Sequence, residues 1–260
     1  MSDKKTLESI LTEVLTEALN EKSASCASKK LDPLEDGISS VESIRISGSD
    51  LDVVNAARVS YGKVSQELSE RDTKLIEFLM KHDHTSPFEH NQLSFRIKAP
   101  IFVARQWFRH RMNSYNEISY RYVKADMKEF HVPHIWRFQD KVNKQSSVGS
   151  FEREDLKAKF KESVASTMKV YEELLAEGVC REQARALLPM STYTEFIFTS
   201  NLHSLMHFIK LRLSPDAQYE IRVYAKALLT IAAQYFPVSI KAFCEKAGIA
   251  QEGIFDFNKK

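Results

Sequence analysis

The chain has 260 residues, of which 43% are apolar and 28% are charged, with a formal charge of +2 at pH 7. This composition is typical of one compact globular domain, and it excludes both a disordered chain and a membrane protein. The balanced charge excludes a general attraction to nucleic acid or to anionic lipid. We therefore expect neither partner, and any preference for anions must come from local clusters of basic side chains.

The N-terminal part of the chain differs in composition from the rest. Residues 6–20 place apolar side chains at helical spacing, which predicts an amphipathic helix that packs in the core or between subunits, or else docks a partner. Residues 21–40 are rich in Ser, Lys and Asp and contain Pro33 and Gly37, which is typical of a linker. We therefore predict an appendage of residues 1–40 joined to one domain of residues 41–260.

The cysteines and the N-terminus indicate a cellular compartment. Cys26, Cys180 and Cys244 lie far apart and form no CxxC pair, which does not suit a disulfide framework. The N-terminal residues carry several glutamates and no apolar signal core, which argues against a signal or transit peptide. We expect a protein of the reducing cytoplasm.

The elements before the basic segment can be placed in chain order. They are a strand at residues 41–46, helices at 50–58 and 69–81, a strand at 93–98 and a helix at 101–111. Asp50 is suited to cap the first helix because its carboxylate can accept from backbone N–H groups. The strand at 93–98 alternates apolar and polar side chains, and Pro100 ends it because proline cannot donate a ladder hydrogen bond.

The second half of the chain is dominated by helical patterns. Helices are predicted near residues 154–176, 201–213 and 216–235. Gly178 is placed to stop the first of them, and Pro215 and Pro237 bound the last. Together these elements predict an α/β (α+β) domain in which a small antiparallel or mixed sheet packs against long helices.

Residues 105–122, RQWFRHRMNSYNEISYRY, contain a concentration of positive charge that is unusual for this chain. The arginines are Arg105, Arg109, Arg111 and Arg121, and only Glu117 opposes them. Crowded like charges repel, so this segment is costly unless an anion neutralises it. Trp107 and Phe108, by contrast, are interpreted as packing residues because aromatic side chains bury well.

A polar row follows the predicted helix 101–111. In an extended strand Glu117, Ser119 and Arg121 share one face, so a carboxylate, a hydroxyl and a guanidinium line up. Arg121 and Ser119 could bind a phosphate while Glu117 accepts from a sugar hydroxyl or a ring N–H, and with Gln106 the row suits a nucleotide. A solvated strand face with a surface ion pair is the simpler alternative.

Two other classes of function are open at this point. Histidines at 82, 84, 90, 131, 134, 203 and 207 could bind a metal, although Ser204 stands where an HExxH motif needs glutamate, so we predict no metal site. A module that binds RNA or nucleotides could use the arginines with Trp107 and Phe108, but it would need a more extended basic surface.

The same residues resemble a known family. Arg109, His110 and Arg111, followed after seven residues by Ser119, match the RHR-x7-S signature of the flavin-dependent thymidylate synthases. Further stretches resemble family blocks in the family order: NAARVSYGK at 55–63, HTSPFEH at 84–90, ARALLP at 184–189, and NLHSLMHFIKLR from residue 201 followed by DAQYEI. The resemblance covers residues 41–245.

The resemblance implies a reaction and its cofactors. In the implied reaction, dUMP is converted to dTMP with 5,10-methylenetetrahydrofolate as one-carbon donor. NADPH reduces FAD, and the reduced FAD supplies the hydride. No enzyme nucleophile attacks the uracil, and Arg212 resembles the catalytic arginine that faces the ring. The family also implies a homotetramer with active sites between subunits.

The resemblance also assigns binding residues. The positions similar to FAD contacts are His84, Ser86, Arg109, His110, Arg111, Glu117, Asn201, His203 and His207. The positions similar to dUMP contacts are Gln106, Arg109, Glu117, Ser119, Arg121, Arg185 and Arg212. His203 and His207 depart from the family pattern, which often has Arg or Asn there, but they lie one turn apart and can reach a shared ligand.

Overall fold

The computed structural model describes residues 30–249. Its centre is an antiparallel sheet with the strand order β1-β2-β3-β7-β4. The strands are β1 (Lys30–Leu31), β2 (Ser40–Ser47), β3 (Gln92–Pro100), β4 (Ser114–Glu117) and β7 (Tyr193–Asn201). The predicted α+β class with a small antiparallel sheet is confirmed. None of the helices in residues 30–249 combines the length and the hydrophobicity that a membrane span requires.

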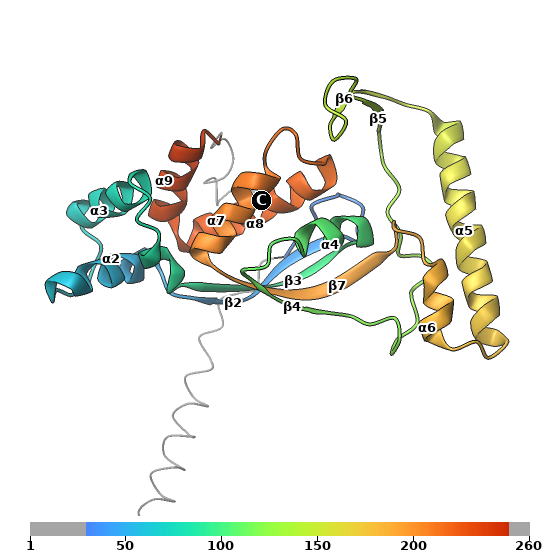
Figure 1. Cartoon of the computed structure of the whole chain (residues 1–260), viewed down its shortest axis with the longest axis horizontal. Coiled ribbons are helices and arrows are strands. Elements are labelled where there is room, and N and C mark those ends of the chain that lie inside the picture. The colour runs from blue at the N-terminus through green and yellow to red at the C-terminus, as the bar shows by residue number, and fades with distance from the viewer. Residues whose placement is uncertain (1–29, 250–260) are drawn as a thin grey trace, which may run out of the picture.

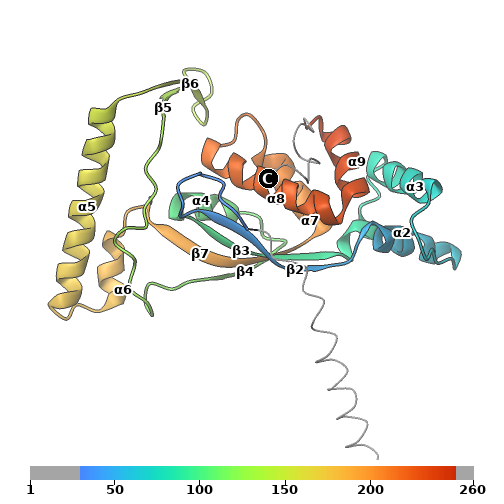
Figure 2. The same cartoon turned by 180° about the vertical axis from the view of Figure 1, so that it is seen from behind.

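Helices cover one face of this sheet and one of its ends. Figures 1 and 2 show α4 (Ile101–Trp107), α7 (Leu202–Arg212) and α8 (Tyr219–Tyr235) on the same face of the sheet. At one end of the sheet lie the helices α2 (Asp50–Arg58), α3 (Glu70–Lys81) and α9 (Pro237–Ala247). The chain also contains short 3-10 turns at Val59–Tyr61 (η2), Ser86–Glu89 (η3) and Arg185–Leu187 (η4). Helices α7 and α8 contact each other, and both contact α9.

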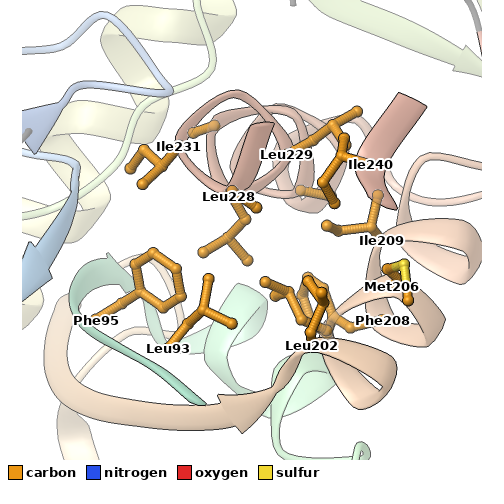
Figure 3. Close-up of a cluster of buried hydrophobic side chains, with 14 of the residues drawn as sticks. Leu93, Phe95, Leu202, Met206, Phe208, Ile209, Leu228, Leu229, Ile231 and Ile240 are labelled. Atoms are coloured by element: carbon orange, nitrogen blue, oxygen red, sulfur yellow. The ribbon is translucent and has the colours of Figure 1, made fainter. Parts of the chain in front are cut away.

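The main core lies between the sheet and these helices. Leu93 and Phe95 of β3 point from the sheet toward α7, α8 and α9, as Figure 3 shows. The apolar face predicted for the strand is confirmed, since Leu93, Phe95 and Ile97 are fully buried, while on the other face Arg96 is exposed and Ser94 is buried. The helices contribute Leu202, Phe208, Leu228 and Ile240, all fully buried. Burial of this apolar surface is the main force that fixes α7 against the sheet.

A separate arm extends from the sheet. It contains the hairpin β5 (Trp136–Gln139) with β6 (Ser147–Phe151), the long helix α5 (Glu154–Ala176) and the short helix α6 (Arg181–Ala184) (Figure 1). A second, smaller core around Met168 and Tyr171 holds the arm together. Helix α5 ends where predicted, because Gly178 adopts a φ of 85° and its N–H bonds the carbonyl of Leu175.

The sequence patterns do not predict several elements of the structure: β1, the hairpin β5–β6, α6, β7 and α9. Strand β7 alternates buried and partly buried residues and lies between β3 and β4. Helix α9 starts with Pro237, which we interpreted only as the end of the preceding helix. Proline serves both purposes here, since it cannot continue α8 but its missing N–H is harmless in the first turn of α9.

Residues 30–40 also differ from the expected linker. Strand β1 pairs with β2, and Leu34 is buried in the main core, so this stretch belongs to the folded body. The predicted amphipathic helix at residues 6–20 lies outside the described residues. The extent of an appendage within residues 1–29 therefore stays a prediction.

Asp50 caps a different helix from the one predicted. Its carboxylate is buried and accepts from the backbone N–H groups of Val238 and Ser239, at 2.8 and 3.0 Å, and from the Ser239 hydroxyl. These donors lie in the first turn of α9, where N–H groups have no partner within the helix. Asp50 thus joins α2 to α9 across 188 positions of sequence.

We expect Asp50→Ala to lower the free energy of unfolding by about 2–4 kcal/mol, because it leaves buried donors without an acceptor. Urea unfolding of both proteins measures the difference. Asp50→Asn keeps one acceptor oxygen and should cost less; equal losses would contradict the capping role.

Burial raises the pKa of Asp50. The difference in free energy of unfolding between wild type and Asp50→Asn should therefore decrease as pH rises from the pKa of Asp50 in the unfolded state to its pKa in the folded state. Above the folded-state pKa the difference should stay constant.

Candidate active site

The basic motif leaves the helix earlier than predicted. Helix α4 ends at Trp107, not at residue 111. The carbonyl of His110 accepts from Asn113 Nδ2 at 3.0 Å and from the Tyr115 hydroxyl at 2.9 Å, and that hydroxyl also lies 3.3 Å from the carbonyl of Trp107. These side chains satisfy carbonyls that a longer helix would have bonded internally. Arg109, His110 and Arg111 therefore lie in a loop.

This loop forms one wall of a cavity of about 890 Å³. The cavity brings together seven residues that the sequence predicted for the site: Arg109, His110, Arg111, Asn201, His203, His207 and Arg212. Glu89 of η3 is the only acidic side chain among its lining residues. Neither Arg109 nor Arg111 forms an ion pair with any residue in the range 30–249. A volume of this order is typical of sites for organic ligands.

Arg212 ends α7 and is held by neutral acceptors. Its Nε donates to His110 Nε2 at 2.9 Å, and its Nη2 donates to the carbonyl of Gln106 at 3.0 Å. No carboxylate of the described chain pairs with it, although a guanidinium usually binds one. Burial lowers the pKa of Arg212. The side chain is thus a fixed, partly desolvated cation at the cavity wall.

His110 is a neutral side chain in this setting. Burial, with the charge of Arg212 and of His207 as smaller causes, lowers the pKa of His110 to about 4. Its ring packs on Phe208 with a centroid distance of 4.7 Å, and it is 8% exposed. At neutral pH the imidazole therefore accepts through one nitrogen and donates through the other.

The N-terminus of α7 faces the same cavity. Asn201 is the N-cap, and its Oδ1 accepts from the N–H of Ser204 at 2.8 Å. Since Ser204 and His203 also line the cavity, the positive end of the α7 dipole lies at this wall. A helix N-terminus beside unpaired arginines is a site suited to phosphate groups.

The remaining predicted nucleotide contacts form a second group that does not line this cavity. Strand β4 ends at Glu117, whose carboxylate accepts from the Thr194 hydroxyl at 2.6 Å. Ser119 lies in a turn, where its carbonyl accepts from Tyr122 N at 2.8 Å. The polar row predicted on one strand face is therefore wrong beyond Glu117. Arg121 lies 3.3 Å from Glu182 of α6, next to η4, which Arg185 begins.

Three further predicted residues, Gln106, His84 and Ser86, do not line the cavity themselves. Gln106 donates through Nε2 to Gln218 Oε1 at 2.6 Å, and its carbonyl is the one that Arg212 binds. His84 is exposed after α3, with its ring 5.9 Å from that of Phe78. Ser86 begins η3, the turn that brings Glu89 to the cavity.

Gln218 was not singled out in the sequence as a residue near the site. It lies in the quoted block DAQYEI, and its amide also donates to Glu220 Oε2 at 2.9 Å. Its place in that block was the available sequence signal, and only the folded chain places it beside Gln106. Trp107, which we interpreted as a packing residue, is fully buried, and that interpretation is confirmed.

Neither thiol of the described residues adjoins the cavity. Cys180 is exposed before α6, and Cys244 is buried in α9, where burial raises its pKa to about 11. A thiol with a raised pKa is a poor nucleophile. In the same part of the chain, no cluster of three or more His, Cys, Asp or Glu side chains is arranged to hold a metal.

Comparison with known proteins finds the same family that the sequence motifs resemble. The family model described as "Thymidylate synthase complementing protein" matches residues 44–238. A flavin-dependent thymidylate synthase from Thermus thermophilus is 48% identical over 198 residues, which cover 76% of this chain and 73% of the relative. Another from Thermotoga neapolitana is 43% identical over 208 residues, which cover 80% of this chain and 91% of the relative.

Solved structures agree as well. A UMP/dUMP methylase from Streptomyces cacaoi bound with 5-Br dUMP is 37% identical, with a TM-score of 0.72, and the match covers 79% of this chain and 94% of the other. The same methylase bound with 5-Br UMP gives a TM-score of 0.71 at 35% identity, covering 81% and 95%. With the family model spanning most of the folded body and close relatives matching over the same range, this chain belongs to the flavin-dependent thymidylate synthase family.

Proposed function

We propose that this protein is an FAD-dependent thymidylate synthase, which methylates dUMP to dTMP. The observation that carries the proposal is Arg212, an arginine without a carboxylate partner in the described chain, fixed at the wall of a cavity that also holds Arg109 and Arg111. Desolvated cations of this kind stabilise negative charge that develops on a bound ring or phosphate. The relatives named as flavin-dependent thymidylate synthases support the same reaction.

The cavity residues fit FAD. Arg109, Arg111 and the N-terminus of α7 offer donors to its phosphates, and Asn201, His203 and His207 line the same wall. His84, Ser86 and Glu117 complete the proposed set, with His84 on the outer side of the ring system. When bound and reduced, FAD supplies the hydride that the methyl group requires.

The second group of residues fits the nucleotide. Arg121 and Arg185, with Ser119, would hold the dUMP phosphate, while Glu117 accepts from a donor on the sugar or the base. Gln106 and Arg109 would also contact dUMP. Gln106 binds Arg212 through its carbonyl, and Arg109 lines the same cavity as Arg212. Arg212 would face the uracil and stabilise negative charge on its oxygen and nitrogen atoms, which raises the electron density at carbon five. This activation needs no covalent enzyme nucleophile, in keeping with the positions of Cys180 and Cys244.

A homotetramer is part of the proposal. Arg212 lines the cavity that also holds Arg109 and Arg111, whereas Arg121 and Arg185 belong to the second group, which does not line this cavity. A single nucleotide would touch both groups if a neighbouring subunit brought one of them to the other. NADPH as reductant and 5,10-methylenetetrahydrofolate as one-carbon donor complete the proposed reaction, which we place in the cytoplasm.

The test is made on the purified full chain. We expect visible flavin absorption that bleaches when NADPH is added without oxygen, and formation of dTMP when dUMP and methylenetetrahydrofolate are present. Omission of dUMP is the matched control and should give no dTMP. A protein that takes up no flavin from excess FAD, or that binds flavin and forms no dTMP, would contradict the proposal. Sedimentation as a monomer would contradict the tetramer alone.

A further inference from the structure

The contact between His110 and Arg212 joins two segments that lie 102 positions apart in sequence. His110 belongs to the loop after α4, and Arg212 ends α7. An arginine side chain has donors and no acceptor, so the nitrogen that lies 2.9 Å from Arg212 Nε must be an unprotonated acceptor. The single proton of the neutral ring is then on Nδ1, the other nitrogen.

This arrangement limits what His110 can offer to a cofactor. Its Nε2 is occupied as an acceptor, and a phosphate offers only acceptor oxygens. His110 can therefore contact a flavin only through Nδ1–H or through the face of its ring. The packing of the ring on Phe208, with a centroid distance of 4.7 Å, holds the imidazole in a fixed orientation.

The two acceptors of Arg212 are well suited to orient it without neutralising it. A carboxylate would hold the guanidinium equally well, but it would cancel the charge that the reaction needs. His110 Nε2 and the Gln106 carbonyl bind two different nitrogens, Nε and Nη2, and so fix the plane of the guanidinium. Its remaining N–H groups stay available for a ligand.

We propose that His110 is a positioning residue for Arg212, acting as a neutral acceptor that aims the guanidinium at the uracil. The role rests on the proposed function, because it assumes that Arg212 acts on dUMP. It differs from the cofactor contact that the family resemblance assigns to the same position. The low pKa of His110, which burial and the neighbouring Arg212 produce, supports it by keeping the ring unprotonated at neutral pH.

Two substitutions separate this role from packing and from cofactor binding. His110→Phe keeps an aromatic ring against Phe208 and removes the acceptor, whereas His110→Gln loses the ring but places an amide oxygen near the position of Nε2. We expect kcat for dTMP, per bound flavin and at saturating dUMP, to fall about ten- to hundredfold in His110→Phe, because small misplacements of a catalytic group cost this much. His110→Gln should recover most of that loss. His134→Phe, which changes an exposed histidine, is the control and should be unchanged.

The order of the two variants decides the question. If His110→Phe is as active per flavin as His110→Gln, or more active, the ring matters for packing and the positioning role is wrong. If both variants lose activity only in proportion to lost flavin, His110 is a cofactor contact and the role is again wrong. A wild-type protein that forms no dTMP would instead overturn the proposed function.

A double-mutant cycle keeps the test decisive if His110→Phe binds flavin poorly. The dissociation constant of dUMP is measured by equilibrium dialysis with excess FAD in wild type, His110→Phe, Arg212→Ala and the double variant. If His110 acts through Arg212, its replacement weakens dUMP binding several-fold in the wild-type background and has no further effect beside Arg212→Ala. Equal effects in both backgrounds would overturn the proposal.

Discussion

Replacement of Arg212 by alanine should reduce dTMP formation by at least about 10²-fold in kcat while FAD stays bound, because removal of one preorganised charge-stabilising donor costs this much or more. Arg212 makes its contacts with His110 and the Gln106 carbonyl, not with Arg109 or Arg111, which carry the proposed phosphate contacts. Single-turnover formation of dTMP and flavin absorbance per subunit measure the two effects separately. Retained turnover at full flavin occupancy would refute the role of Arg212 on the uracil.

Arg212→Lys is the matched control for this prediction. Lysine keeps the positive charge but has one nitrogen, so it cannot bind His110 Nε2 and the Gln106 carbonyl in the geometry of the guanidinium fork. We expect its kcat to lie between those of wild type and Arg212→Ala. A lysine variant as active as wild type would show that charge alone suffices and that the fixed plane of the guanidinium is unimportant.

Replacement of Trp107 by alanine should lower the free energy of unfolding by about 3–5 kcal/mol, the usual loss for a buried tryptophan. Its indole is fully buried and contacts the rings of Phe196, Phe198, Phe208 and Tyr224, at centroid distances of 5.4, 5.5, 4.7 and 5.8 Å. These rings come from β7, α7 and α8, so Trp107 fastens the end of α4 to three elements. Urea unfolding of the flavin-free proteins measures the loss without a contribution from ligand binding.

Trp107→Phe tests the explanation. Trp107 Nε1 is buried and has no hydrogen-bond partner among the described residues, so its removal sacrifices no bond. The phenyl ring keeps much of the aromatic contact, and we expect a loss of about 1–2 kcal/mol from the smaller cavity. If phenylalanine cost as much as alanine, the indole nitrogen would have a partner that matters, such as a buried water.

Most of the fold could be predicted where local patterns are strong. The alternation of Leu93, Phe95 and Ile97 predicted β3, and helical spacing predicted α5 and α8 at nearly their observed bounds. The failures have particular causes. Helix α4 is shorter than its pattern because Asn113 and Tyr115 bind the carbonyls of Trp107 and His110. Strand β4 stops at Glu117, and the Ser119 carbonyl then accepts from the N–H of Tyr122 in a turn. Periodicity contains neither the side-chain contacts that end α4 nor the turn that follows β4.

The sequence by itself determined the family, the basic motif and the identity of the residues that could bind anions, because these depend on residue type and order along the chain. Only the tertiary structure decided which of them meet. It joined Arg212 to His110 and Gln106, gathered Arg109, Arg111 and the N-terminus of α7 around one cavity, and left Arg121 and Arg185 apart from it. The physical reason is that these contacts are made between segments about a hundred positions apart, and they form only when the apolar faces of β3, β7, α7 and α8 are buried together.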